Sequence, residues 1–241
     1  MEITLTPFLE NTLKVYQPET GYRFGIDSVL LANFINLKYK EKILELCAGS
    51  GIISLIALKR FPKVKVYTLE IENLFIKCLK LNAKENNLED RFFVIKGDIN
   101  FLPFKSGFFD VVFTNPPYFK PEAGRLSPYE KENIARKELN FSLSEFIKKV
   151  SLLLKNRGRF YLIFTAFRLA ELIFLLKKHK LEPKIIRFVH SYPGSEAKLV
   201  LILSVKNAGE ETRILPPLFI YEKKKGNYTQ EVKNYLKKLE N

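Results

Sequence analysis

The chain alternates short apolar runs with segments of helical apolar spacing, and this alternation constrains its fold more than any other feature. The run KILELC ends at small residues, as a buried strand before a turn does, and GIISLIALKRF after it repeats apolar residues on one helical face. Strand-like runs lie at residues 42–47, 63–71, 91–99 and 108–114, and helix-like segments at 51–61 and 73–87. Regular alternation of strands and helices predicts an α/β fold, with a parallel sheet covered by helices on both faces.

The second half of the chain continues this pattern and then changes it. Ser142 is a candidate N-cap of a helix that we expect to end at Gly158. Further segments indicate a strand at 159–164, a helix at 168–180 and two strands on either side of the YPGSEA turn at 192–197. The sequence therefore predicts a Rossmann-like, seven-stranded, mostly parallel sheet with an antiparallel C-terminal hairpin.

Two charged segments lie outside the predicted sheet. Residues 119–140 are poor in apolar side chains, which predicts a long loop or a mobile helix directly after the NPPY motif. Residues 222–241 indicate a basic turn followed by an amphipathic helix.

The composition excludes several classes of protein. The 241 residues are 46% hydrophobic, so the chain can bury a full core and disorder is not expected. Cys47 and Cys78 have no CxxC partner, which argues against a disulfide framework or a zinc site and fits a reducing cytosol. His179 and His190, the two histidines, make a histidine-dependent metal site and Ser-His-Asp chemistry improbable. The chain shows neither a signal peptide nor the roughly 18 uninterrupted apolar residues of a membrane span, so we expect a cytoplasmic protein without metal or membrane contact.

The positive charge is concentrated in the second half of the chain. Residues 1–118 contain 15 Lys and Arg against 13 Asp and Glu, whereas residues 119–241 contain 25 against 13. A lysine-rich solvated surface, as in some thermophiles, is one explanation. Because glutamate does not increase with lysine in this half, we favour a face that binds a polyanion such as nucleic acid.

Three features at successive strand ends indicate a nucleotide-like ligand. The turn ELCAGSGI (45–52) has glycines between a strand and a helix, where backbone N–H groups can approach a ligand closely. Glu70, 21 residues after Gly49, is placed to bind ribose hydroxyls, although an ordinary exposed acid is the alternative. Asp98 after Gly97 could accept a hydrogen bond from an adenine amino group, or could only favour a turn.

The fourth feature is the NPPY motif, Asn115 to Tyr118. Pro116 and Pro117 lack N–H donors and fix an extended backbone, so carbonyl oxygens and the Asn115 side chain are available as acceptors for one amino group. Tyr118 offers a flat face on which a planar base can stack. In isolation the motif indicates only a strand terminated by prolines. After the glycine turn and the two acids, it predicts a receptor for an amine attached to a planar ring, at the carboxyl edge of one sheet.

Together these motifs resemble class I S-adenosylmethionine (SAM)-dependent methyltransferases with the NPPY signature of amino-group methylation. Blocks outside the SAM core extend the likeness to the bacterial tRNA (adenine-N(6)) methyltransferases that act on position 37 of valine tRNA. The similar blocks are QPETGYRFGIDSVLLANF, ELCAGSGI, NPPYFK, IARKELNFSLSEFIKKVSLLLKNRGRF and LFIYEKKKGNYTQEV.

The resemblance implies a role for each motif. A SAM site would be formed by Arg23, Asp27, Glu45, Ala48, Gly49, Gly51, Glu70, Asp98 and Asn115. The catalytic residues would be Asn115, Pro116, Pro117 and Tyr118. Arg23, Phe24 and Asp27 belong to a block that closes over the site in such enzymes, although a strand followed by an N-cap Asp27 explains them equally well. Cys47 replaces the first glycine of the usual pattern, and we expect SAM binding to survive this change.

The expected organisation is an N-terminal hairpin and helix covering the site (1–40), a methyltransferase domain (41–206) and a basic C-terminal extension packed on it (207–241). The expected reaction is methylation of an adenine amine in a tRNA anticodon loop, with tRNA bound by the basic second half. Glutamine methylation of a release factor and guanine methylation of rRNA are alternatives with the same motif. RNA binding without catalysis and a dinucleotide enzyme that does not use SAM are further alternatives. The oligomeric state is open.

Overall fold

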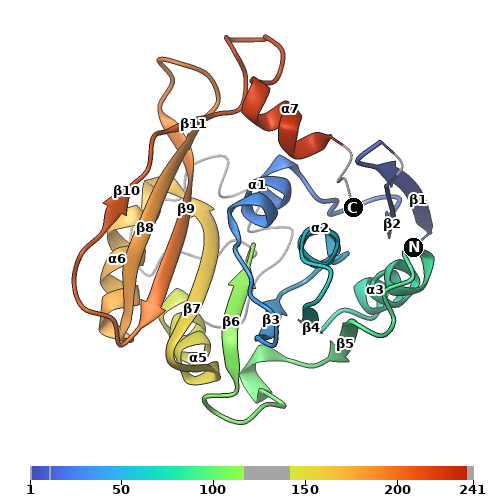
Figure 1. Ribbon diagram of the computed structural model, residues 1–241, viewed down its shortest axis with the longest axis horizontal. Helices are drawn as coiled ribbons and strands as arrows, with labels where there is room; N and C mark the ends of the chain where they lie inside the picture. The colour runs from blue at the N-terminus through green and yellow to red at the C-terminus, as the bar shows by residue number, and fades with distance from the viewer. Residues whose placement is uncertain (1, 11, 117–141, 238–241) are drawn as a thin grey trace.

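The structure is a computed structural model that describes residues 2–10, 12–116 and 142–237 (Figure 1). Its main sheet has the order β10-β8-β9-β7-β6-β3-β4-β5, and β11 pairs with β8. The longer strands are β3 (Lys42–Leu46), β4 (Lys65–Glu70), β5 (Phe92–Lys96), β6 (Phe109–Thr114), β7 (Leu154–Thr165), β8 (Leu181–His190) and β9 (Ala197–Lys206). β10 (Arg213–Ile214) and β11 (Leu218–Phe219) are two-residue strands parallel to β8.

The predicted fold class is confirmed. β3 to β7 are parallel to one another, and β9 pairs antiparallel with both β7 and β8. The seven expected strands are thus present, and β10 and β11 were not expected, because two residues give too short a pattern to recognise. Thr114, at the end of β6, donates a hydrogen bond from Oγ1 to the carbonyl of Leu46 in β3 (2.8 Å), which aligns the carboxyl ends of these two strands.

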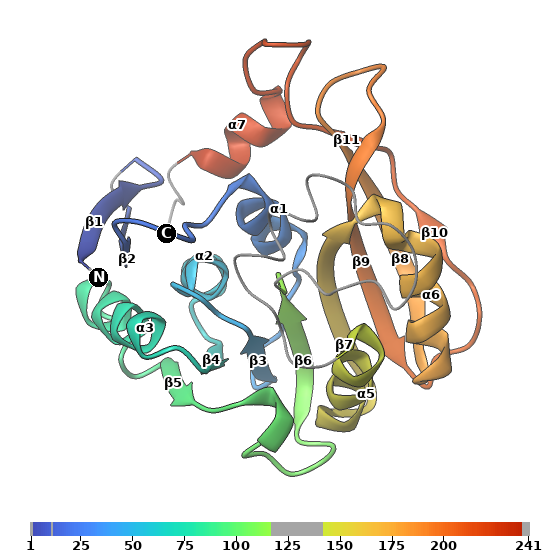
Figure 2. The ribbon, with the colours of Figure 1, turned by 180° about the vertical axis from the view of Figure 1, so that it is seen from behind.

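Helices cover both faces of the sheet, as Figures 1 and 2 show from opposite sides. One core contains buried residues of α1 (Ile26–Phe34), α2 (Ile52–Arg60), α3 (Asn73–Glu85) and α7 (Gln230–Leu236). The other contains residues of α5 (Leu143–Leu153) and α6 (Leu169–Lys178). None of the helices in the described residues is long and apolar enough to cross a membrane.

The structure corrects two local predictions. The helix capped by Ser142 ends at Leu153, because the chain turns there into β7, and Gly158 lies inside that strand next to Arg157 in the left-handed region (φ 62°). The N-cap of α1 is Gly25 and not Asp27, which lies in the first turn of the helix. The prediction for 119–140 falls outside the described residues. The domain boundaries at residues 40 and 206 stay predictions.

Two asparagines, Asn82 of α3 and Asn86 at its C-cap, join the N-terminal hairpin to this helix. The hairpin consists of β1 (Ile3–Phe8) and β2 (Leu13–Pro18), which pair with each other. Asn82 accepts from the backbone N–H of Tyr16 and donates to its carbonyl, and Asn86 makes the same pair of bonds to Lys14. Because these asparagines are four residues apart on one helix face, they satisfy the outer edge of β2 as a neighbouring strand would.

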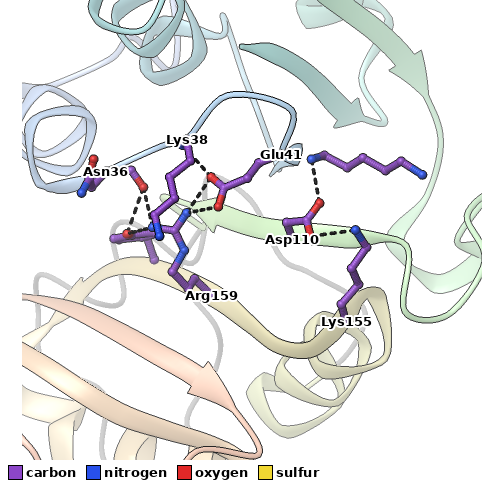
Figure 3. Close-up of polar contacts among 8 residues, drawn as sticks. Asn36, Lys38, Glu41, Asp110, Lys155 and Arg159 are labelled. Atoms are coloured by element: carbon purple, nitrogen blue, oxygen red, sulfur yellow. Dashed lines mark hydrogen bonds and ion pairs between the residues drawn. The ribbon is translucent and has the colours of Figure 1, made fainter. Parts of the chain in front are cut away.

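An ion pair fixes the connection between α1 and β3 at the amino end of β3 (Figure 3). Arg159 of β7 contacts both carboxylate oxygens of Glu41 (2.7 and 2.6 Å) and donates to the carbonyl of Asn36 (2.7 Å). The Arg159 and Glu41 side chains are only 18% and 17% exposed. Nearby, the Lys155–Asp110 pair (2.7 Å) is more open, at 41% and 28%.

We therefore predict that Arg159→Ala lowers the free energy of unfolding by about 2 kcal/mol, because the Glu41 carboxylate is left partly buried without its partner. Lys155→Ala is the matched control and should cost less than about 1 kcal/mol, because its pair is better solvated. Urea unfolding of both variants measures the difference. Equal losses would contradict the assignment of stability to the buried pair.

Candidate functional site

A small pocket, partly open to solvent, lies where the turn after β3, the start of α1 and the end of β6 meet. Its lining residues are Tyr22, Phe24, Ser28, Glu45, Cys47, Ala48, Ser50, Ile52, Ile53 and Asn115. The pocket thus combines the glycine turn and the NPPY motif, at the carboxyl edge of the sheet where ligands of α/β proteins bind.

The turn between β3 and α2 requires unusual backbone angles. Cys47, Gly49 and Gly51 all have positive φ (54°, 56° and 78°). A Cβ on Gly51 would lie 2.5 Å from Leu79 Cδ2 and 2.8 Å from Phe92 Cζ, so only glycine fits. Cys47, which departs from the glycine pattern, adopts the left-handed conformation that a glycine would take, at a cost of roughly 1 kcal/mol.

Glu70 closes this turn. One carboxylate oxygen accepts from the N–H of Gly49 (2.8 Å), and the other accepts from the N–H groups of Ile71 (2.8 Å) and Glu72 (3.1 Å). The side chain lies at the end of β4, as the sequence predicted, and is 7% exposed. A carboxylate has about four acceptor positions, so one remains for a ligand hydroxyl.

Glu45 is buried beneath the turn. It is 1% exposed and accepts hydrogen bonds from the Ser54 side chain and from the Ser54 N–H (3.2 Å). Burial raises the pKa of Glu45 to about 8, and the negative charge of Glu70 adds to the rise. The Glu45 carboxyl is therefore protonated at neutral pH, and a cation bound in the pocket would favour its ionised form.

Asn115 is oriented by the first turn of α1. Its Nδ2 donates to Asp27 Oδ2 (2.9 Å) and to Ser28 Oγ (3.2 Å). The Asp27 carboxylate is the natural partner of an amide nitrogen, so the orientation of the amide is determined and Oδ1 points away from α1. Tyr22 completes this group, because its hydroxyl bonds to the Ser28 side chain. Although the residue is 48% exposed, desolvation of its hydroxyl and, less, the charge of Asp27 raise its pKa.

The structure brings some of the expected residues together and leaves others apart. Glu45, Ala48 and Asn115 line the pocket, and Asp27 contacts Asn115. Arg23 is exposed and donates to Thr6 Oγ1 of β1 (3.1 Å) instead of entering the pocket. Asp98, past β5, is the N-cap of the short helix Ile99–Phe101 and accepts from Asn100 N–H (2.7 Å). Pro116 is half-buried after β6, and Pro117 and Tyr118 fall outside the described residues.

Several residues of the site were not predicted from the sequence. Tyr22 and Ser28 line the pocket on either side of residues that were predicted, so their neighbourhood was the available signal. Ile71 (53% exposed) and Phe101 (82% exposed) follow Glu70 and Asp98 and place apolar surface beside these acids. No group of three or more His, Cys, Asp or Glu that could bind a metal ion occurs within the part of the chain that the structure describes.

Comparisons with known proteins agree with this site. The sequence profile of the methyltransferase small domain matches residues 22–179. A protein of Porphyromonas gingivalis named tRNA1(Val) (adenine(37)-N6)-methyltransferase is 30% identical over 77% of this chain and 75% of its own length. A protein of the same name from Pedobacter heparinus is 25% identical over 93% of both chains. A solved structure described as a predicted O-methyltransferase from Agrobacterium tumefaciens has a TM-score of 0.70 at 20% identity, covering 87% of this chain and 94% of that one.

The fold and the pocket define a class I methyltransferase, the class that uses SAM. The chain belongs to the methyltransferase small domain family. This confirms the resemblance noted in the sequence, including its enzyme class and its cofactor.

The raised pKa of Glu45 leads to a prediction about stability. The folded protein keeps this proton to higher pH than the unfolded chain, so the free energy of unfolding falls as the pH rises from about 4.5 to about 8. Glu45→Gln removes this contribution, and the melting temperature of the variant should fall less across this range than that of the wild type. Thermal unfolding at several pH values tests this, with the exposed Glu89→Gln as control. Parallel pH profiles of wild type and E45Q would refute the buried protonated carboxyl.

Proposed function

We propose that the protein transfers the methyl group of SAM to the exocyclic amine N6 of an adenine in a tRNA anticodon loop, at position 37 of valine tRNA. The relatives from P. gingivalis and P. heparinus carry this activity in their names. The observation that carries the proposal is the orientation of Asn115, whose amide nitrogen is bound to Asp27 and whose oxygen is left to accept from a substrate amine.

The residues around the glycine turn fit SAM. Gly49 brings the backbone of the turn to the ligand without a side chain, and Glu70, at the end of the next strand, is placed to accept from a ribose hydroxyl. Asp98 with the apolar surface of Ile71 and Phe101 suits the adenine ring. Glu45, Ala48 and the turn backbone suit the methionine part, whose ammonium would stabilise the Glu45 carboxylate. When bound, SAM supplies an electrophilic methyl group.

The chain's own contribution to catalysis is to orient the target nitrogen. Asn115 Oδ1 and the carbonyl of Pro116 accept the two N–H groups of the amine, and these bonds draw the nitrogen lone pair out of conjugation with the ring. The nitrogen becomes nucleophilic without a strong general base. We assign stacking of the target ring to Tyr118, on the sequence alone. An unpaired loop base can enter such a pocket with little loss of stacking.

The proposal is tested by incubating the protein with SAM and unmodified tRNA from its own source, followed by mass spectrometry of the nucleosides. N6-methyladenosine is expected, and it should be absent when the valine tRNA transcript carries guanine at position 37. Parallel incubations with rRNA and with a release factor complete the test: methylguanosine in the rRNA or methylglutamine in the release factor, while the tRNA stays unmodified, would exclude this substrate.

Substitutions at Asn115 and Asp27 should separate catalysis from cofactor binding. Asn115→Ala removes an acceptor for the amine, and we predict a fall in kcat of about a hundredfold, as for other lost catalytic hydrogen bonds. Asp27→Asn leaves the Asn115 amide without its charged acceptor and should lower kcat about tenfold, because the amide can rotate. SAM affinity, measured by calorimetry, should fall by a smaller factor than kcat in both variants.

A reciprocal exchange serves as the control for this pair. Asn115→Asp alone places two carboxylates in contact and removes the donor of the hydrogen bond between positions 27 and 115. Asp27→Asn combined with Asn115→Asp restores one donor and one acceptor at this contact. The double variant should therefore regain activity relative to Asn115→Asp. If the double variant is no more active than the single one, the contact does not orient the amide.

A turn of three lysines, Lys223 to Lys225, supports an RNA substrate. All three are exposed, and the turn is fixed by the stacked rings of Tyr221 and Tyr228, whose centroids are 5.2 Å apart. The turn follows β11 at the carboxyl end of β8 and projects from the pocket edge of the sheet (Figure 1). A fixed turn that presents several cations suits contact with phosphates.

We predict that replacing Lys223, Lys224 and Lys225 by alanine weakens tRNA binding and reduces the slope of log Kd against log salt by about two to three. Filter binding over a range of salt concentrations measures both effects. Replacing Lys40, Lys63 and Lys65, three exposed lysines near the amino ends of β3 and β4, is the control. An equal effect there would indicate only nonspecific charge.

A further inference from the structure

Phe167 and Lys198 form an exposed pair beside the pocket. Phe167, in the short helix Ala166–Arg168 after β7, is 71% exposed, and Lys198 Nζ lies 5.3 Å from the centre of its ring. Lys198 is near the start of β9, which runs antiparallel to β7, with Thr165 opposite Leu199. Both side chains therefore lie at the carboxyl edge of the sheet, the edge that holds Asn115.

The strand register sets the distance between this pair and Asn115. Thr114 of β6 pairs with Leu162 of β7, so Asn115 lies level with Ile163. Phe167 comes four residues after Ile163, and the chain between them completes β7 and enters the short helix. The backbone of Phe167 therefore lies roughly 10 Å beyond Ile163 along the strand direction. Phe167 thus lies beyond Asn115 at the same edge of the sheet, within reach of a nucleotide that adjoins the one in the pocket.

A phenylalanine ring that is mostly exposed contributes little to the buried core. The lysine over this ring places a cation beside a flat apolar face. This combination matches single-stranded nucleic acid, where a base supplies a planar ring and the next phosphate supplies the negative charge. The net charge of the second half of the chain, 25 Lys and Arg against 13 Asp and Glu, is complementary to the same partner.

We propose that Phe167 and Lys198 bind a nucleotide next to the target adenine, with its base stacked on the Phe167 ring and its phosphate paired with Lys198. The inference rests on the proposed function, because the occupant is the same tRNA loop. The pair would hold the loop open beside the pocket while the target base is turned inward.

The first test compares two exposed phenylalanines. Phe167→Ala should raise KM for tRNA about tenfold, the effect of losing one stacked base, and leave SAM affinity and the melting temperature unchanged. Phe174→Ala is the matched control, because Phe174 is 65% exposed but lies on α6. Phe167→Tyr keeps a ring and should retain wild-type KM.

The second test concerns the charge. Lys198→Ala should weaken tRNA binding and reduce the salt slope by about one, as expected for one lost phosphate contact, while Lys198→Arg should retain both values. Binding is measured with catalysis disabled by Asn115→Ala, so that affinity is separated from turnover.

The outcomes distinguish this inference from the proposed function. If wild-type protein methylates tRNA and Phe167→Ala has the same KM as wild type or as Phe174→Ala, the nucleotide site is wrong and the function stands. If wild-type protein methylates no tRNA adenine, the function fails and the nucleotide site fails with it. If light scattering shows that Phe167→Ala dissociates an oligomer of wild-type protein, the ring belongs to a protein interface and the inference is overturned.

Discussion

The turn between β3 and α2 is the constraint on which the rest of the site depends. Two separate elements bond to it: Glu70 from β4 accepts from Gly49, and Asn82 from α3 donates to the carbonyl of Ser50. Beneath the turn, Glu45 of β3 accepts from Ser54 of α2 and so joins the two elements that the turn connects. Because the turn passes through left-handed backbone angles, it has few alternative shapes that keep all these bonds. It thereby sets the direction of α2, the position of the acid at the next strand end and, through Asn82, the place of the N-terminal hairpin.

Much of the fold was predictable because its signals are local. The sequences of α2 and α3 have the apolar spacing of helices, and the run between them has that of a strand. Ser142 and Glu145 form a capping box, as the serine at the start of this helix indicated. The end of that helix was not predictable in the same way. Gly158 is a normal helix stop by sequence, but the chain had already left the helix to place β7 beside β6, a tertiary requirement without a local signal. β10 and β11 depend likewise on pairing with β8.

The site was predictable where it follows strand ends and not where it depends on contacts between distant segments. Glu45, Gly49, Glu70 and Asn115 lie where the order of strands requires. The contact between Asp27 and Asn115 joins residues 88 positions apart, so no spacing rule could show it, and Arg23 in the same block turned instead toward β1. Phe167 gave no signal in the sequence, because an exposed phenylalanine in an apolar stretch cannot be distinguished from a buried one.

The short strands beside β8 have a consequence for the behaviour of the protein in concentrated solution. β10 and β11, with the N–H groups of Leu215, Ile220 and Tyr221 bonded to carbonyls along β8 and just past it, cover an edge that would otherwise be open. An open edge is a template for a strand from another molecule, and aggregation through such edges is a hazard for any sheet. The returning chain therefore makes two very short strands, and not the long β8, the edge of the sheet on this side, which leaves little template for a neighbouring copy.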